Sequence, residues 1–534
     1  MNTSIPPTSD PPPSDKPRST GTVFPMAVIE LGTSSIRMAV GQTDGVSGVR
    51  ILEQLVRGVS LGKDTFTRRE IQRDTLQQCV TVMKSYRRKL EEYQCSDPKH
   101  IRVVATSAVR EAANRMDFLD RVYTATGFAV ETIDDAEIAR LTYLGIRPIL
   151  ESEPDLADAT TLLMEVGGGN TEILLLRGRN IMHSQSYRLG SLRMQQMIRQ
   201  YQAAREQSVN IMHGQIDRTL EQMRDVIPQH GEIELLAIGS DMRFAAATLQ
   251  LDVVGGTMVR IPLRKLLRLT GQLTQMTVEQ IMRQYHLELS QAETLVPALL
   301  AYVRMAQMLG GQHILVTGFN LRDALLQGLL QSTDWSEDFR DQIFRSAEEL
   351  ARKFHIDLEH SRHVARLARE IFRGLQSEHK LDVRCESILY VAALLHEAGL
   401  FISTSSYHKH SHYLISNSEI FGLNSLDHKL TALVARYHRR ATPKASHEPF
   451  AELDRDSRVV LSRLASILRL ANSLAHSRTQ RIRSVECSVE RNRLVIRPVG
   501  PSGDLSMEQL ELRQNSSMFQ DVFGMNVLLR EDSL

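Results

Sequence analysis

Short apolar runs alternate with longer amphipathic segments over the first 330 residues of the chain. The runs are rich in Val, Ile, Leu and Met, and they flank two glycine-containing turns, at 32–35 and 167–171. A similar short run lies at 101–106, with the length of a buried strand. The segments 234–249 and 313–330 each predict a strand that runs into a turn and then a helix. Helical spacing of apolar positions at 68–94 and 108–124 predicts helices between the strands. The alternation predicts two α/β lobes, over residues 23–148 and 149–335.

The pattern changes after residue 338 to long helical segments with many histidines. It predicts an all-α domain over 340–478 and a small α+β domain over 480–534. The first 22 residues are rich in Pro and Ser and contain no apolar core segment. They predict a disordered tail and not a signal peptide.

Composition is that of a soluble globular protein, because 42% of the 534 residues are hydrophobic and 24% are charged. The net charge of +1 gives no reason to expect a membrane surface or a specific nucleic acid as partner. The four cysteines have no CxxC spacing, which favours free thiols and a reducing cytoplasm. No apolar run is long enough to cross a bilayer.

Both glycine turns follow a strand that ends in glutamate, at Glu30 and Glu165. Backbone N–H groups in such a turn can form an anion-binding concavity, and the glutamates could hold Mg²⁺ or a water beside a phosphate. The predicted phosphate-binding residues are Gly32, Thr33, Ser34 and Ser35 in the first turn and Gly167, Gly168, Gly169, Asn170 and Thr171 in the second. The alternative is a pair of ordinary hairpins whose glutamates are only solvated.

The order of the motifs resembles the exopolyphosphatase / guanosine pentaphosphate phosphatase (Ppx/GppA) family. "IELGTSSIRMAV" is similar to its D-L-G-S-N-S-F-R phosphate loop, and "MEVGGGNTEI" to its D-I-G-G-G-S-T-E loop. "VVATSAVREAANRMDFL" and "ETIDDAEIARLTYLG" resemble two further segments. "HSRHVARLA" and "AALLHEAGLFI" resemble the HD-type helical domain of the long members.

The resemblance implies two actin-like, sugar-kinase-like (RNase H-like) lobes with a cleft between them. It implies Mg²⁺-dependent hydrolysis of terminal phosphoanhydrides of polyphosphate, or of guanosine pentaphosphate (pppGpp), by a homodimer. The protein's part would be to position the chain, neutralise charge and orient a water. Arg110 would be the phosphate clamp, because a guanidinium offers a planar pair of donors.

Several positions depart from the family pattern, and they are positions where the resemblance places catalytic or phosphate-binding residues. The family's catalytic glutamate falls on Ile138, and Glu137 precedes it, about 100° away on a helix. Both loop aspartates are glutamates here, and Asp241 brings a negative charge towards the phosphate site. Two hypotheses follow. Either Glu30, Glu137 or Glu165 is the base and Glu30 and Glu165 hold Mg²⁺, or the cleft binds polyphosphate or an alarmone without hydrolysing it.

The histidine-rich domain offers His360, His396, Glu397 and His438 as an HD-type cluster. Glu397 stands where such metal sites have aspartate, and Asn472 stands where the last aspartate is expected. A second metal is therefore not expected, and we favour histidines that hydrogen-bond internally or line a polyanion channel. A separate nucleotide phosphohydrolase in this domain is the remaining alternative.

Overall fold

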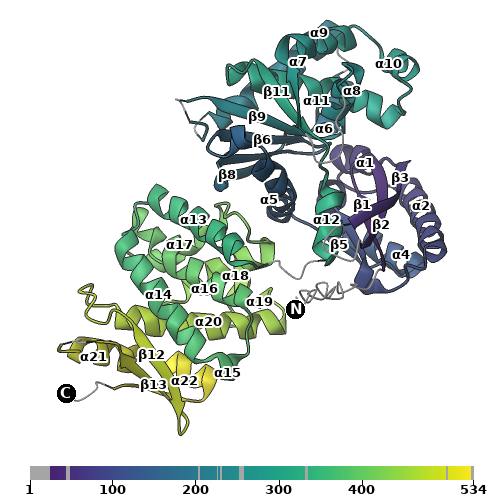
Figure 1. Cartoon of the computed structure of the whole chain (residues 1–534). Coiled ribbons are helices and arrows are strands. Elements are labelled where there is room, and N and C mark those ends of the chain that lie inside the picture. The colour runs from purple at the N-terminus through teal and green to yellow at the C-terminus, as the bar shows by residue number, and fades with distance from the viewer. Residues whose placement is uncertain are drawn as a thin grey trace, which may run out of the picture.

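The computed structural model describes residues 24–43, 49–201, 205–224, 226–228, 231–251, 258–330, 335–439, 441–500 and 503–530. The tail predicted at 1–22 lies outside these residues. Two α/β lobes are followed by a helical domain and a small C-terminal domain (Figure 1). None of the helices in the described ranges has both the length and the apolar character needed to cross a membrane.

Lobe I is built on a five-stranded mixed sheet in the order β3-β2-β1-β4-β5. Its strands are β1 (Pro25–Leu31), β2 (Ser35–Thr43), β3 (Val49–Gly58), β4 (Ile101–Ala105) and β5 (Val130–Thr132). The first three form an antiparallel meander, and β4 adds parallel to β1. The helices are α1 (Leu61–Arg68), α2 (Arg73–Glu92), α3 (Ser107–Arg110), α4 (Arg115–Thr126) and α5 (Asp135–Ser152), with 3₁₀ turns at Pro98–His100 and Pro154–Leu156.

Lobe II repeats this plan with a six-stranded sheet in the order β10-β11-β9-β6-β7-β8. Its strands are β6 (Thr160–Val166), β7 (Thr171–Arg177), β8 (Asn180–Tyr187), β9 (Ile233–Ile238), β10 (Met258–Pro262) and β11 (His313–Thr317). Here β6, β7 and β8 are the meander and β9 adds parallel to β6. The helices are α6 (Ser191–Tyr201), α7 (Arg205–Met223), α8 (Ser240–Thr248), α9 (Leu263–Thr274), α10 (Val278–Tyr285), α11 (Leu289–Met308) and α12 (Leu321–Leu330).

These two mixed sheets fit the prediction of two actin-like lobes, and both strand–turn–strand predictions are confirmed. The central strands β1 and β6 are buried on both faces, which explains why their sequences are nearly continuous apolar runs. The glutamates interrupt these runs only where the strands end. The ends of β1 and β6 therefore bring the two turns towards the same space between the lobes.

Helices alone form the described part of residues 337–474, and a three-stranded sheet with two helices follows. The helices of the domain are α13 (Glu337–Lys353), α14 (Leu358–Gly374), α15 (Gln376–His379), α16 (Val383–Leu395), a 3₁₀ turn at Ala398–Phe401, α17 (Tyr407–Ser416), α18 (Ser425–Arg436), α19 (Glu448–Ala451) and α20 (Arg455–Leu474). The C-terminal domain contains β12 (Val485–Glu490), β13 (Arg493–Pro498), α21 (Ser506–Asn515), α22 (Ser517–Phe523) and β14 (Asn526–Leu529).

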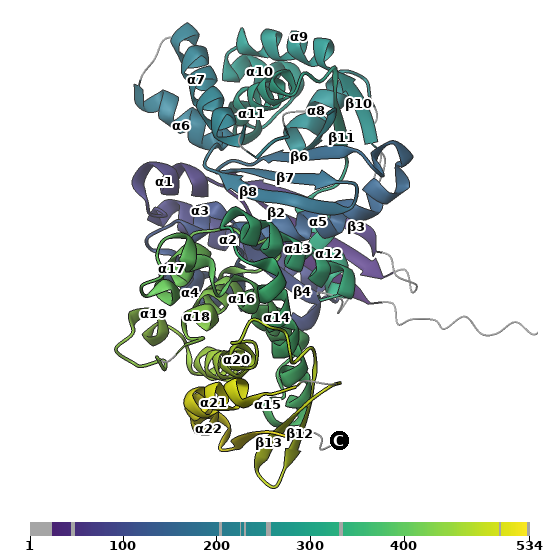
Figure 2. The ribbon, with the colours of Figure 1, turned by 90° about the vertical axis from the view of Figure 1, so that its left-hand side faces the viewer.

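The helical domain packs directly on the lobes, and the views in Figures 1 and 2 show α13 next to β8. The Gln342 amide accepts a hydrogen bond from Ile181 N at 3.1 Å. The Ser425 hydroxyl donates to Asp134 at 2.5 Å. One continuous apolar core joins this domain to the lobes, so removing the domain would expose apolar surface on them.

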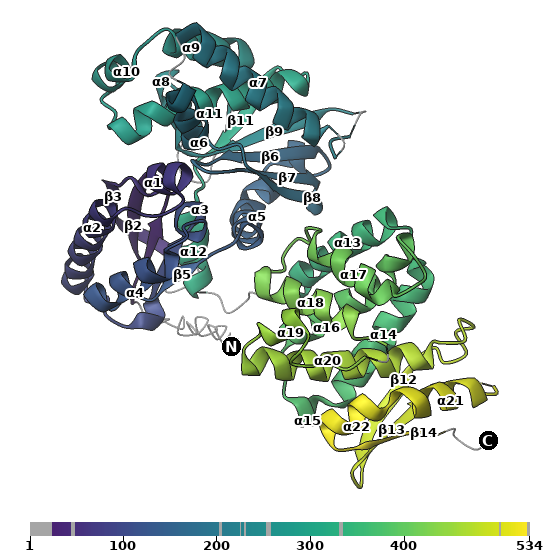
Figure 3. The same cartoon turned by 180° about the vertical axis from the view of Figure 1, so that it is seen from behind.

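Two details of the predicted organisation are corrected by the structure. Helix α12, assigned by its position to the second lobe, packs on β1 and α5 of lobe I (Figure 3). The helix predicted at 108–124 is split into α3 and α4. The Asn114 side chain between them exchanges two 2.9 Å hydrogen bonds with the backbone of Ile71, which anchors the break to the segment before α2.

Candidate active site

The two glycine turns have the same hydrogen-bonded geometry. Gly32 N donates to Ser35 O at 3.0 Å, and Gly167 N donates to Asn170 O at 2.8 Å. Between these closing bonds, the N–H groups of Thr33, Ser34, Gly168 and Gly169 donate to no described residue. Unused donors on two facing turns are the arrangement that an anion needs.

The turns touch each other across the lobe boundary, and glycine is required for that approach. A Cβ atom on Gly168 would lie 2.1 Å from Thr33 Oγ1. One on Gly169 would lie 2.6 Å from Ser107 Oγ, at the start of α3. The predicted glycine motif is thus a contact between lobes as well as a turn.

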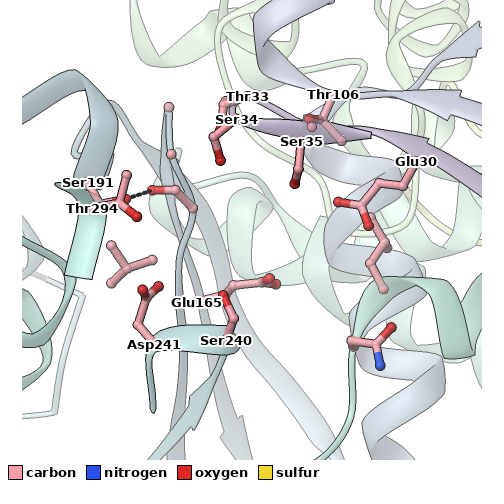
Figure 4. A pocket seen from close by; sticks show the side chains of 18 of the residues that line it. Glu30, Thr33, Ser34, Ser35, Thr106, Glu165, Ser191, Ser240, Asp241 and Thr294 are labelled. Atoms are coloured by element: carbon pink, nitrogen blue, oxygen red, sulfur yellow. Dashed lines mark hydrogen bonds between the residues drawn. The ribbon is translucent and has the colours of Figure 1, made fainter. Parts of the chain in front are cut away.

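A cavity of about 420 Å³ lies between the lobes, and both turns line it (Figure 4). The predicted residues at its wall are Glu30, Gly32, Thr33, Ser34, Ser35, Glu165, Gly167, Gly168, Gly169 and Asn170. Thr171 does not line the cavity: it is fully buried, and its hydroxyl donates to Leu189 O. Its role is to fix the turn and not to contact a ligand.

Three arginines that the sequence analysis did not single out also line the cavity: Arg37, Arg243 and Arg322. They come from β2, α8 and the first turn of α12. Each follows a strand and its turn: Arg37 lies near the start of β2, and Arg243 and Arg322 lie in the first turns of α8 and α12. An arginine a few residues after such a strand and turn is the signal that could have identified them. They offer guanidinium donors to a phosphate, although six carboxyl groups, Glu30, Asp135, Glu165, Glu172, Asp241 and Glu288, line the same cavity. An oligophosphate there would therefore need a cation as well.

Glu30 is held in two ion pairs and is therefore a poor candidate for a base. Its carboxylate accepts from Arg322 Nη1 at 2.5 Å and from Arg37 Nη1 at 3.4 Å. Burial acts to raise the pKa of Glu30, but the two guanidiniums outweigh it and the pKa is lowered. The carboxylate stays ionised and serves to position the arginines.

Glu165 and Glu172 form a pair of like charges on the same hairpin. They are direct partners in the antiparallel register of β6 and β7, and both line the cavity. Burial, with the nearby Glu30, raises the pKa of Glu165; burial, with Asp135, raises the pKa of Glu172 well above its usual range. Carboxyls opposite each other on a sheet are destabilising unless a proton or a cation lies between them.

Asp241 is a carboxyl in the main cavity whose pKa suits proton transfer at neutral pH. It lies in the first turn of α8 and lines the cavity, where Figure 4 shows its side chain facing the same space as Ser34 and Glu165. Burial raises its pKa to about 7, against the opposing effect of Arg37. In the sequence, Asp241 stands out only as an unfavourable charge, because burial is not visible in the motif.

Glu137 lies outside the cavity, and the prediction that it acts there does not fit its position. Both of its carboxylate oxygens accept from Arg140 at 2.7 Å, and Arg102 approaches at 3.3 Å. Ile138, the next residue on α5, does line the cavity. The helical offset of about 100° between neighbours explains why Glu137 cannot take the place of the missing carboxylate.

Arg110 also lies outside the main cavity, contrary to its predicted role as clamp. Its guanidinium donates to Ile133 O at 2.7 Å and is paired with Asp135. It lines a second cavity of about 480 Å³, which contacts the helical domain and shares Asp135 and Glu172 with the first. A phosphate in the main cavity would meet Asp135 and not Arg110.

Three members of the predicted histidine cluster converge in the helical domain. One ligand atom each from His360, His396 and Glu397 lies within 4.8 Å of the others. Burial lowers the pKa of His360 to about 4 and also lowers the pKa of His396, so both rings are neutral. His438 is not part of this group, because its Nδ1 contacts Ala435 O at 2.6 Å and its Nε2 contacts the Tyr407 hydroxyl at 3.1 Å.

Comparisons with known proteins agree with the architecture. The sequence model of the Ppx/GppA phosphatase family matches residues 39–333, and that of Ppx/GppA phosphatase domain III matches residues 344–514. A crystal structure of an exopolyphosphatase-like protein is 18% identical, with a TM-score of 0.50, over 57% of this chain and 97% of its own. An exopolyphosphatase from Cytophaga hutchinsonii is 22% identical over the same shares, with a TM-score of 0.49. An Aquifex aeolicus family member is 19% identical over the same shares, with a TM-score of 0.47.

Proposed function

Because the chain belongs to the Ppx/GppA phosphatase family, we propose that it hydrolyses terminal phosphoanhydride bonds in the cavity between its lobes. The proposed substrates are inorganic polyphosphate or pppGpp. The observation that carries this proposal is a carboxyl with a pKa of about 7, Asp241, in a cavity that also holds three arginines and two glycine turns.

The residues of this chain supply the phosphate site. The free N–H groups of the two turns and the hydroxyls of Thr33, Ser34 and Ser35 would surround the terminal phosphate. The negative charge of the phosphates next to the terminal one would be neutralised by Arg37, Arg243 and Arg322. Since little covalent chemistry is demanded of the protein in phosphoryl transfer, this positioning accounts for most of the proposed catalysis.

Mg²⁺ fits the carboxylate pair of Glu165 and Glu172. Both are oxygen donors with raised pKa values in the cavity wall, and Asn170 Oδ1 nearby in the same wall is buried with no hydrogen-bond partner among the described residues. These are the ligand types that Mg²⁺ prefers. Glu165 keeps its predicted role as a ligand, whereas Glu30 is already neutralised by arginine. When bound, Mg²⁺ would offset phosphate charge in the transition state.

Asp241 is the proposed general base. Its carboxylate would accept a proton from a water, and the oxygen of that water would bond to the terminal phosphorus. The bridging P–O bond then breaks, and the bonding electrons leave with the shortened polyphosphate or nucleotide. A base whose pKa is near the working pH is present in its deprotonated form and still binds a proton well. Asp241 would therefore take the place of the carboxylate that is missing at Ile138.

The pH dependence of hydrolysis follows from this assignment. Asp241 acts in its deprotonated form, so kcat/KM should rise about tenfold per pH unit below about pH 7 and level off above it. A pH profile of phosphate release with saturating Mg²⁺ measures this. A profile that is flat through neutral pH would contradict the assignment of Asp241.

One observation favours a second function, which is binding without hydrolysis. Ile138 lines the cavity at the position of the family's catalytic glutamate, and an apolar side chain there cannot accept a proton. In this alternative the arginines and turns retain a polyphosphate or an alarmone as a signal. Both functions use the same anion site, so they differ only in turnover.

Phosphate release from long-chain polyphosphate and from pppGpp, with and without Mg²⁺, tests the proposed function. We expect Mg²⁺-dependent release from at least one substrate, and loss of both binding and release in Arg37→Ala. Glu137→Gln is the matched control, because that carboxylate lies outside the cavity. Tight binding of either substrate without release would support the binding function instead.

A further inference from the structure

Arg193 connects the two lobes at the second glycine turn, and the proposed hydrolysis assigns it no role. It lies in the first turn of α6 in lobe II, which packs against α1 of lobe I (Figures 1 and 2). Its side chain is 21% exposed. It does not line the cavity, so any effect on a bound phosphate has to pass through the residues that Arg193 contacts.

The start of α6 holds the carbonyl groups of all three glycines in the turn. Ser191 N donates to Gly167 O at 2.9 Å, and Arg193 N donates to Gly168 O at 3.0 Å. The Gly169 carbonyl accepts from a side chain instead, Arg193 Nε at 2.9 Å. A peptide unit is planar and trans, so its N–H points away from its C=O. These bonds therefore also set the directions of the N–H groups that follow, two of which are the unused donors of this turn.

Two residues of lobe I hold the Arg193 guanidinium in place. Its Nη2 donates to both carboxylate oxygens of Glu111, at 2.9 and 3.1 Å. Its Cζ lies 4.1 Å from the centre of the Phe66 ring, in α1, where the face of the ring attracts a cation. A guanidinium can make these contacts and the bond to Gly169 O together, because its donors are spread over a rigid plane. One side chain thus connects lobe I to a peptide group of the phosphate turn.

We propose that Arg193 is a positioning residue that couples the closure of the lobes to the orientation of the second glycine turn. This inference rests on the proposed function, because it concerns the same phosphate site. With the lobes together, Glu111 and Phe66 fix the guanidinium, and Arg193 Nε fixes the Gly169 carbonyl. With the lobes apart, the guanidinium loses both partners, so the turn is oriented for phosphate only in the closed cleft. By linkage, a phosphate that binds the ordered turn stabilises the closed lobes.

Substitutions in the full chain test the coupling through kcat and KM for phosphate release. Arg193→Met keeps the length of the side chain but has no donor, and it should lower kcat/KM about 10–10²-fold, the order of loss that a misplaced group causes. Glu111→Gln, in the other lobe, should cause a smaller loss, because its amide oxygen still accepts. The double variant should lose no more than Arg193→Met alone, since Glu111 acts through Arg193.

Two further variants separate positioning from a structural role. Arg188→Gln is the matched control: Arg188 Nη2 also pairs with Glu111, at 3.1 Å, but its side chain is 74% exposed. Such a pair contributes little, so wild-type rates are expected. Arg193→Lys keeps the charge but not the planar donors. It should keep the wild-type thermal unfolding midpoint without restoring kcat/KM, and a restored rate would contradict the proposal.

Hydrogen exchange tests the coupling independently of turnover. The N–H of Gly167 donates to Asn170 O at 2.8 Å, so its exchange with solvent reports opening of the turn. Peptides that contain residues 167–171 should exchange faster in Glu111→Gln, across the lobe boundary, and as in wild type in Arg188→Gln.

Unchanged exchange in Glu111→Gln would overturn the proposal, and so would losses of kcat/KM that multiply in the double variant. A wild-type protein that releases no phosphate would contradict the proposed hydrolysis instead. The exchange of the turn would still decide the coupling in that case, because it needs no substrate.

Discussion

Replacing Asp241 by asparagine should lower the rate of phosphate release about 10²–10⁴-fold, which is the usual cost of losing a general base. The substitution keeps the size of the side chain and removes only the ability to accept a proton at neutral pH. Burial, which gives Asp241 its pKa of about 7, also means that the neutral amide is tolerated there. We therefore expect normal folding and retained affinity for polyphosphate.

The measurement is kcat and KM for release from polyphosphate, beside the thermal unfolding midpoint. Because the affected step is chemical, the loss should appear in kcat with KM little changed. Glu165→Gln provides a contrast: loss of a proposed Mg²⁺ ligand should weaken the dependence on Mg²⁺ concentration as well as the rate. A full rate in Asp241→Asn would remove Asp241 from the chemistry.

Replacing Gly168 by alanine should lower kcat/KM about 10²-fold, because it forces the two phosphate turns apart. The added Cβ would lie 2.1 Å from Thr33 Oγ1 and 2.9 Å from Thr33 Cβ. A change of the Thr33 rotamer moves the oxygen but not its Cβ, so the backbones of the two lobes have to separate. The donors on the turns would then no longer converge on one phosphate.

Gly271→Ala is the matched control for this substitution. Gly271 lies in α9 of lobe II, and a Cβ there meets no atom within 4 Å, so activity should be unchanged and stability slightly raised. Steady-state kinetics and thermal unfolding of both variants distinguish a local effect from misfolding. Equal activity of Gly168→Ala and wild type would show that the contact between the turns is not needed.

The sequence predicted the glycine turns of the site better than the ion pairs between its charged side chains. The glycine turns could be recognised because glycine and the strand-ending Glu30 and Glu165 stand together in the chain. The helical offset that placed Glu137 away from Ile138 was also predictable. The ion pair between Glu30 and Arg322 was not, since these residues are 292 positions apart and motif order says nothing of their distance. The same holds for Arg110, whose partner Asp135 was not anticipated.

The sequence predicted the order of the domains, but not which elements α12 and α13 pack on. Hydrophobic spacing shows that α12 and α13 each have a buried face, but the same apolar face could pack on either lobe. The hydrophobic pattern therefore could not predict that α12 packs on β1 and that α13 packs on β8. The helix at 108–124 is split where the Asn114 side chain bonds to the backbone of Ile71 and Ala113 N donates to Arg69 O, and these hydrogen bonds override helical spacing.

The most direct test of phosphoanhydride hydrolysis between the lobes measures binding and turnover on the same samples. Equilibrium binding of long-chain polyphosphate and phosphate release with Mg²⁺ would be determined for wild type and Asp241→Asn at about pH 8, above the pKa of Asp241. We expect both proteins to bind polyphosphate with similar affinity and only wild type to release phosphate at an appreciable rate. Binding by wild type with no release would contradict this expectation, and would leave a phosphate-binding protein built on a phosphatase fold.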